Sequence, residues 1–125
     1  MNQITIIKFG TAVLTTQDEQ GIDMIDRHII AQHGQLIAAH QSPTLIVSSG
    51  AVGLGKTVLG SKHINTEKIL QKRLFAEIGQ PLLFRLWQKS LPRRIVLQKL
   101  VTYTDLKRKS TTETIQAALN NNLLY

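Results

Sequence analysis

The chain has 125 residues, of which 42% are hydrophobic and 18% are charged, a balance typical of globular proteins rather than disordered ones. This length suffices for one domain with a core, but it is short for an enzyme that must hold a nucleotide and a second substrate. The absence of cysteine excludes disulfides, thiolate zinc sites and cysteine nucleophiles, and the net charge of +7 suits nucleic acid or small anionic ligands.

Several classes of partner are not expected. No apolar run is long enough for a secretory signal or a membrane span, which predicts a cytoplasmic protein without a membrane partner. Basic residues are spread along the chain and aromatic residues make up only 5%, so we expect no nucleic acid partner. The histidines do not stand at ligand spacing with carboxylates, so we expect no metal ligands among them: His28, His33, His40 and His63.

The first predicted element is a strand over Ile4 to Phe9, whose nearly continuous apolar side chains indicate a strand buried on both faces of a parallel sheet. Lys8 lies near its carboxyl end, directly before Gly10 and Thr11. Ligands of open α/β sheets gather outside the carboxyl ends of strands, so Lys8 is a candidate ligand-binding cation. The alternative is a lysine that snorkels from the strand end.

A helix and a second strand follow. The polar stretch Ala12 to Gly21 is predicted to be a loop, and apolar residues at three- and four-residue steps predict an amphipathic helix over Ile22 to His40. Asp23 or Asp26 would favour its start, and Ser42-Pro43 would end it.

Thr44 to Val47 predicts a second buried strand that opens into Ser48, Ser49 and Gly50. The order strand, helix, strand indicates a parallel βαβ unit. This unit would place the glycine-rich turn beside Lys8.

The rest of the chain is predicted to be mainly helical. Ile64 to Leu91 has a helical pattern that Gly79-Gln80-Pro81 should kink or split. A third extended run covers Arg94 to Val101, and a fourth strand is expected to start near Tyr125.

Between these two runs, Asp105 to Lys109 is predicted to be a charged connector, and Thr111 to Asn122 a helix. Ser110, Thr111 or Thr112 would cap that helix, and Glu113 would lie in its first turn.

One motif suggests a nucleotide site. Gly50, Gly55, Lys56 and Thr57 fit the phosphate-loop pattern G-x-x-x-x-G-K-[ST]. A phosphate loop needs a long helix that starts at its Lys-Thr pair, yet Gly60 follows after two residues. We therefore expect no phosphate role for Lys56, and keep a phosphate-loop NTPase as an alternative.

Four segments carry a resemblance to a known family. KFGTAVLT at Lys8 to Thr15 and IVSSGAVGLG at Ile46 to Gly55 resemble the two N-terminal signatures of the amino acid kinase superfamily and, within it, of the glutamate 5-kinase family. Lys72 to Gln88 is similar to that family's helix with its Gly-Gln and Trp landmarks, and Gln98 to Asp105 looks like its next strand and acidic turn. The likeness spans nearly all of this sequence but about the first half of the family's kinase domain.

The resemblance implies an α/β fold, a three-layer αβα sandwich with a mainly parallel sheet, of which residues 1–125 would be the truncated N-terminal part. It implies ATP-dependent phosphorylation of the side-chain carboxylate of L-glutamate to L-glutamyl 5-phosphate, the first step of proline biosynthesis. ATP and Mg²⁺ would be the cofactors, and the full-length protein would be a homo-oligomer. We expect the 125 residues to be inactive alone.

By the same resemblance, Lys8 matches the catalytic lysine that contacts the transferred phosphate. Gly10 and Thr11 match the glycine turn near the phosphates of ATP, and Ser49, Gly50 and Ala51 match the glutamate-binding turn. The alternatives are another carboxylate or carbamate kinase of the superfamily, the phosphate-loop NTPase, and a basic module that binds anions or RNA.

Overall fold

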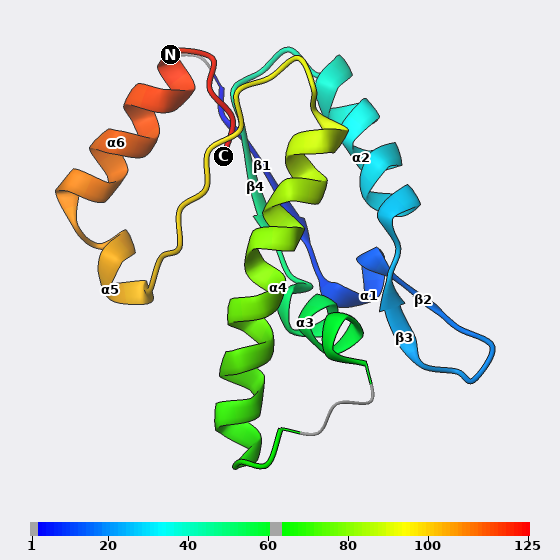
Figure 1. The fold of residues 1–125 in the computed structure, drawn as a ribbon. Coiled ribbons are helices and arrows are strands. Elements are labelled where there is room, and N and C mark those ends of the chain that lie inside the picture. The colour runs from blue at the N-terminus through cyan, green and yellow to red at the C-terminus, as the bar shows by residue number, and fades with distance from the viewer. Residues whose placement is uncertain (1–2, 61–63) are drawn as a thin grey trace.

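The computed structural model describes residues 3–60 and 64–125, so His63 lies outside the described residues. They form a mixed α/β fold with two small sheets (Figure 1). In chain order the elements are β1 (Thr5–Phe9), α1 (Thr11–Leu14), β2 (Thr15–Gln17), β3 (Asp23–Ile25), α2 (Arg27–Ala39), β4 (Thr44–Ser48), α3 (Ala51–Leu59), α4 (Lys68–Ser90), α5 (Tyr103–Leu106) and α6 (Lys109–Asn120). None of the helices in the described residues combines the length and the apolar character of a membrane span.

The predicted parallel βαβ unit is confirmed. β1 and β4 pair in parallel, with Thr5 opposite Thr44 and Phe9 opposite Ser48, and α2 connects them. The carboxyl ends of both strands therefore lie at the same edge of the sheet.

The helices α2 and α4 cover one face of this sheet. Phe9 is buried there, with ring centroid distances of 4.8 Å to His33 of α2 and 4.9 Å to Trp87 of α4. Side chains alternate between the faces of a strand, and Ile6 is 67% exposed and Val47 45% exposed. The prediction of strands buried on both faces is wrong, because both packing helices lie on the Phe9 side.

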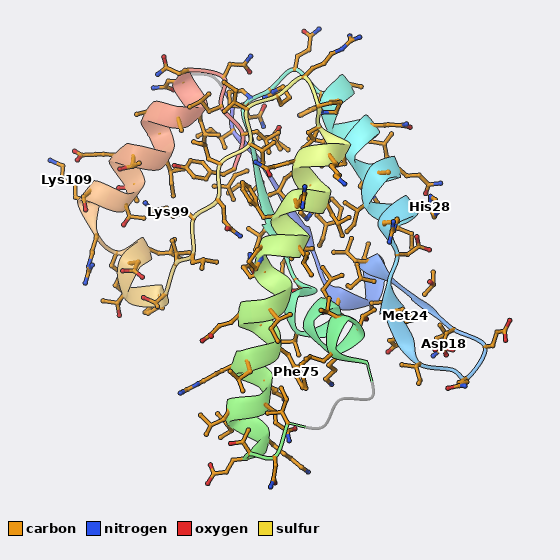
Figure 2. The ribbon with its side chains drawn as sticks, in the orientation of Figure 1. Asp18, Met24, His28, Phe75, Lys99 and Lys109 are labelled. Carbon is orange, nitrogen blue, oxygen red and sulfur yellow. The ribbon has the colours of Figure 1, made fainter. Side chains whose placement is uncertain are left out.

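The stretch predicted to be a loop contains helix α1 and a β-hairpin instead. β2 and β3 pair antiparallel, and Asp18 lies in the hairpin, at the start of the loop that joins the two strands (Figure 2). Its carboxylate accepts hydrogen bonds from the backbone N–H groups of Gln20 and Ile22, each at 2.9 Å, and Gly21 has a φ of 77°. An aspartate that bonds to nearby N–H groups and a glycine with positive φ together close the turn.

Helix α2 begins at Arg27 rather than at Ile22. The Asp26 carboxylate accepts a hydrogen bond of 2.8 Å from the backbone N–H of His28 and caps the helix, whereas Asp23 lies in β3. The prediction that one of these aspartates caps the helix is thus confirmed for Asp26.

Helix α4 is a single helix from Lys68 to Ser90, so of the kink or split predicted at Gly79-Gln80-Pro81 the split does not occur, and the predicted start at Ile64 is wrong. Proline cannot donate a backbone hydrogen bond and weakens a helix interior. The buried residues of α4 lie on both sides of Pro81, at Gly79 and Leu83, so packing holds both halves in one helix.

The predicted third and fourth strands are reduced to one parallel bridge between Val96 and Leu124. The N–H of Leu97 donates to the carbonyl of Leu124 at 2.7 Å, and the N–H of Ile46 donates to the carbonyl of Tyr125. The C-terminal residues therefore lie between β4 and the extended run, as Figure 1 shows. Leu100 in the later part of that run is 72% exposed, so packing does not hold this part in a strand.

Part of the predicted charged connector is the short helix α5. The Thr102 hydroxyl caps the N–H of Asp105, and the Asp105 carboxylate accepts bonds from the Thr102 N–H at 2.9 Å and hydroxyl at 2.8 Å. Both bonds hold the pKa of Asp105 below its ordinary value, and the bond from the Thr102 backbone N–H has the larger effect.

The N-cap of helix α6 lies two to four residues before the caps that the sequence predicts. Its N-cap is Arg108, whose side chain makes no capping bond, so the predicted caps lie inside the helix. Glu113 lies beyond the first turn and faces Lys109, with 3.5 Å between Oε1 and Nζ. The cap prediction is therefore wrong, because the connector itself becomes helical.

Candidate functional site

The two predicted site turns lie side by side. The N–H of Ser49 donates a hydrogen bond of 2.9 Å to the carbonyl of Phe9, across the ends of β4 and β1. Gly10 and Thr11 follow Phe9 directly, and Gly50 and Ala51 follow Ser49. The backbone therefore brings the residues of both turns together at one edge of the sheet.

The Gly10 turn is open. Gly10 is the N-cap of α1 with a φ of −73°, and a Cβ built on it would meet no atom within 4 Å. Thr11, the first residue of α1, is exposed. Neither backbone conformation nor packing requires glycine here, so the free space leaves room for a ligand close to the backbone.

The Gly50 turn is closely packed. Gly50 is buried with a φ of 116°, and a Cβ on it would lie 2.9 Å from Cδ1 of Ile25. Ala51 is the first residue of α3, so the first N–H groups of this helix face away from its body without intrahelical partners. Such N–H groups, at the positive end of the helix dipole, suit a carboxylate or a phosphate.

Lys8 is exposed and lies opposite Val47 in the sheet register. Alternation places its side chain on the face opposite Phe9. Within residues 3–60 and 64–125 it makes no hydrogen bond or ion pair, so the structure brings Lys8 to the edge but not into contact with the two turns.

The phosphate-loop motif has a different geometry from that of a nucleotide site. Helix α3 starts at Ala51, so Lys56 and Thr57 lie in its second half rather than at its N-terminus. The Lys56 ammonium is 5.9 Å from the ring centroid of Phe75, which lies on α4 (Figure 2), and the Thr57 hydroxyl donates to the carbonyl of Gly53 at 3.0 Å. Both side chains are engaged with the α3 and α4 helices themselves.

Two glycines let α3 and α4 cross with their backbones in contact. A Cβ on Gly55 would overlap the carbonyl of Phe75, and a Cβ on Gly79 would overlap the carbonyl of Ala51. The glycine of the GKT motif is therefore explained by helix packing, and the crossing fixes where the Gly50 turn lies.

Two residues that pack beside the Gly50 turn were not among the predicted site residues. Trp87 is 4% exposed, and its indole N–H donates a hydrogen bond of 3.0 Å to the hydroxyl of Ser48. The one-turn spacing of Gly79, Leu83 and Trp87 in the sequence was the available signal for a buried row on α4. The contact of Ile25 with Gly50 had no such signal, because it depends on the unpredicted hairpin.

A cavity of about 460 Å³ lies beside this site, between β4, α4 and the extended run. Ser48 and Trp87 contribute to its wall, together with apolar side chains, but the six predicted site residues do not. In the part of the chain that the structure describes, no three histidine or acidic side chains gather closely enough to hold a metal ion.

Comparison with known proteins identifies relatives that match most of the chain, although no protein-family model matches it. The chain is 40% identical over 119 residues to the glutamate 5-kinase of Rhodopirellula baltica, which covers 92% of this chain and 30% of that protein. It is 36% identical over 110 residues to the Thermus thermophilus glutamate 5-kinase, covering 84% of this chain and 28% of that protein. It is 31% identical over 129 residues to the Escherichia coli glutamate 5-kinase, covering 98% of this chain and 35% of that protein.

The chain thus spans about a third of the length of these curated relatives. The match to the Escherichia coli enzyme covers 98% of this chain, so the aligned region includes both turns and α4. The chain is therefore a homologue of the N-terminal region of glutamate 5-kinase.

Proposed function

We propose that this chain provides the glutamate-binding turn and part of the phosphate site of a kinase that transfers the γ-phosphoryl group of ATP to the side-chain carboxylate of L-glutamate. The product would be L-glutamyl 5-phosphate, in the first step of proline biosynthesis. The observation that carries the proposal is the bond between Ser49 and Phe9, which joins the two turns in a homologue of glutamate 5-kinase.

The two turns have separate roles in this proposal. Ser49, Gly50 and Ala51 bind L-glutamate, whose carboxylate is matched by the N–H groups at the start of α3. Gly10 and Thr11 lie near the phosphates of ATP, where the open space over Gly10 lets a phosphate approach the backbone.

Lys8 is the proposed catalytic residue. ATP, when bound, supplies the phosphoryl group, and the reaction brings two anions together. Phosphoryl transfer depends mainly on positioning and on stabilisation of negative charge. The exposed ammonium group of Lys8, at the end of β1, can offset this charge, while the N–H groups of the two turns orient the anions.

Mg²⁺ would serve the same reaction, but the described residues offer no donor set that fits it, so we derive no step through this ion. We propose that residues 1–125 form the first part of an amino acid kinase domain, a three-layer αβα sandwich. The exposed apolar side chains Ile6 and Val47 support a second covering layer on that sheet face. A cytoplasmic location and a homo-oligomeric full-length enzyme belong to the same proposal.

Calorimetric titration of the 125-residue chain with L-glutamate and with ATP tests the proposal. Ser49→Ala should weaken L-glutamate binding about tenfold, the effect of one hydrogen bond to a charged group. Lys8→Ala should weaken ATP binding, and Lys56→Ala is the matched control that should leave both affinities unchanged.

Three results would contradict the proposal. A loss of nucleotide binding in Lys56→Ala would favour the phosphate-loop NTPase. Tighter binding of another carboxylate or of carbamate would favour a different kinase of the superfamily, and tight, salt-dependent RNA binding would favour the basic module. We expect no ATP-dependent formation of glutamyl phosphate by the 125 residues alone.

A further inference from the structure

Three residues of α4, each one helical turn from the next, lie along the Gly50 turn, and this part of α4 runs antiparallel to the turn. Gly79 meets the carbonyl of Ala51, and Cδ1 of Leu83 lies 3.8 Å from the place that a Cβ on Gly50 would take. Trp87 bonds to Ser48. One row of α4 thus contacts the turn along its length.

The last of these contacts is part of a chain of two hydrogen bonds. The Trp87 indole N–H donates to Oγ of Ser48 at 3.0 Å, and the Ser48 hydroxyl donates to the carbonyl of Ser49 at 3.0 Å. An indole nitrogen can only donate. The Ser48 oxygen must therefore accept from Trp87, which leaves its own proton for the Ser49 carbonyl.

These two hydrogen bonds fix the peptide group between Ser49 and Gly50. In a trans peptide the N–H points away from the carbonyl of the preceding residue. Because Ser48 holds the Ser49 carbonyl, the Gly50 N–H must point the opposite way. The other peptide group of Ser49 is fixed by its bond to the Phe9 carbonyl, and Trp87 packs on the Phe9 ring at 4.9 Å between centroids.

We propose that Trp87 and Ser48 are positioning residues for the amino-acid substrate, because they hold the Gly50 N–H in the direction in which it can donate to the substrate carboxylate. This inference rests on the proposed function of the turn. Glycine itself restricts the backbone very little, so without the two hydrogen bonds the Ser49–Gly50 peptide can rotate. A rotated peptide would present the Ser49 carbonyl to the substrate in place of the N–H, and a carbonyl oxygen repels a carboxylate.

Calorimetric titration of the 125-residue chain with L-glutamate tests this role. Trp87→Phe keeps an aromatic ring against Phe9 but removes the indole N–H, and Ser48→Ala removes the hydroxyl. Each change should weaken binding by roughly two- to tenfold, the effect of one net hydrogen bond. The double variant should bind no more weakly than the worse single variant, because both changes disrupt the same pair of linked hydrogen bonds. Ser48→Thr, which keeps the hydroxyl, should bind as the unchanged protein does.

Ser90→Ala is the matched control. It removes a hydroxyl of the same helix that donates to the Trp87 carbonyl at 2.8 Å without contacting the turn, so glutamate affinity should not change. An unchanged affinity in Trp87→Phe, or losses that multiply in the double variant, would overturn the inference.

A measurement without ligand separates this inference from the proposed function. In amide NMR spectra of the ligand-free chain, the Gly50 resonance should shift in Trp87→Phe and in Ser48→Ala, with no further shift in the double variant. If the unchanged chain fails to bind L-glutamate while these shifts occur, the proposed substrate is wrong but the hydrogen-bond chain stands. If the Gly50 resonance does not respond, the hydrogen-bond chain is overturned whatever the ligand.

Discussion

The two glycine turns at the edge of the sheet look alike in sequence, yet they differ in how strongly the protein constrains them. Gly50 has a φ of 116° and is enclosed by Ile25 and Leu83, whereas Gly10 has a φ of −73° and nothing within 4 Å of a built Cβ. The first glycine is required by the protein's own packing. Gly10 is not required by packing, and we propose that a ligand uses the free space beside it.

The contrast predicts that substitutions in the Gly50 turn act mainly on stability, whereas substitutions in the Gly10 turn act mainly on ligand binding. The Gly50 turn is held by α3, α4 and the hairpin, so changes there should lower stability before they alter binding. The Gly10 turn leads into a four-residue helix whose first three residues are exposed, so changes there should alter binding with little effect on stability. Substitutions in both turns test whether the two turns differ in this way.

The largest effect is expected beneath the constrained turn. Gly55→Ala would push a methyl group into the Phe75 carbonyl of α4, and overpacking of this kind should lower the free energy of unfolding by about 3 kcal/mol. Chemical denaturation followed by circular dichroism measures this loss.

Gly53→Ala is the control within the same helix, because a Cβ there meets only Ile25, at 3.7 Å. It should keep or raise stability, by up to about 1 kcal/mol, since alanine favours helices over glycine. Equal losses in the two variants would show that α3 and α4 do not cross closely at Gly55.

A smaller loss is expected for Gly50→Ala, about 1–3 kcal/mol, because an alanine at this positive φ is strained and its methyl group meets Cδ1 of Ile25. Shortening the neighbour in the double variant Gly50→Ala with Ile25→Val should recover part of the loss, since only the steric term is relieved. Full recovery in the same denaturation experiment would show that the backbone conformation is not strained.

For the open turn, Gly10→Ala should change the free energy of unfolding by less than about 0.5 kcal/mol, because the φ is ordinary and the space is free. The same variant should weaken ATP binding, because the methyl group takes the space proposed for a phosphate. Calorimetry with ATP tests this, and a stable variant with unchanged ATP affinity would remove the support that the open space gives to a phosphate site.

The smallest effect is expected outside both turns, at the start of α5. The folded protein lowers the pKa of Asp105, so this carboxylate adds stability above its unfolded pKa and loses that contribution as the pH falls through the lower folded value. The Thr102 amide resonance should therefore shift below about pH 4, the ordinary range of an aspartate. Asp105→Asn should abolish that shift, and its persistence would assign the titration to another group.

The sequence predicted the central βαβ unit because Ile4–Phe9 and Thr44–Val47 are apolar runs and the helical periodicity between them is strong. It also placed the two turns side by side, since parallel strands end at one edge of a sheet. The apolar runs, the helical periodicity and the strand order were therefore enough to predict that the two turns are neighbours.

The remaining features depend on contacts that periodicity does not encode. The hairpin rests on the hydrogen bonds of Asp18 and on Gly21, and Pro81 is tolerated inside α4 because residues on both sides of it are buried. The bonds from Trp87 to Ser48 and from Ser48 to Ser49 join residues 39 positions apart and then adjacent ones. Such pairings follow from the packing of α4 on the turn, so they became visible only in the folded chain.

An amide NMR titration of the 125-residue chain with L-glutamate tests most directly whether the Gly50 turn is the glutamate site. We expect the resonances of Gly50 and Ala51 to shift until the site is saturated, while those of Lys56 and Thr57 move little. Shifts confined to Lys56 and Thr57, or no saturable shift at Gly50 and Ala51, would contradict the assignment of the Gly50 turn as the glutamate site.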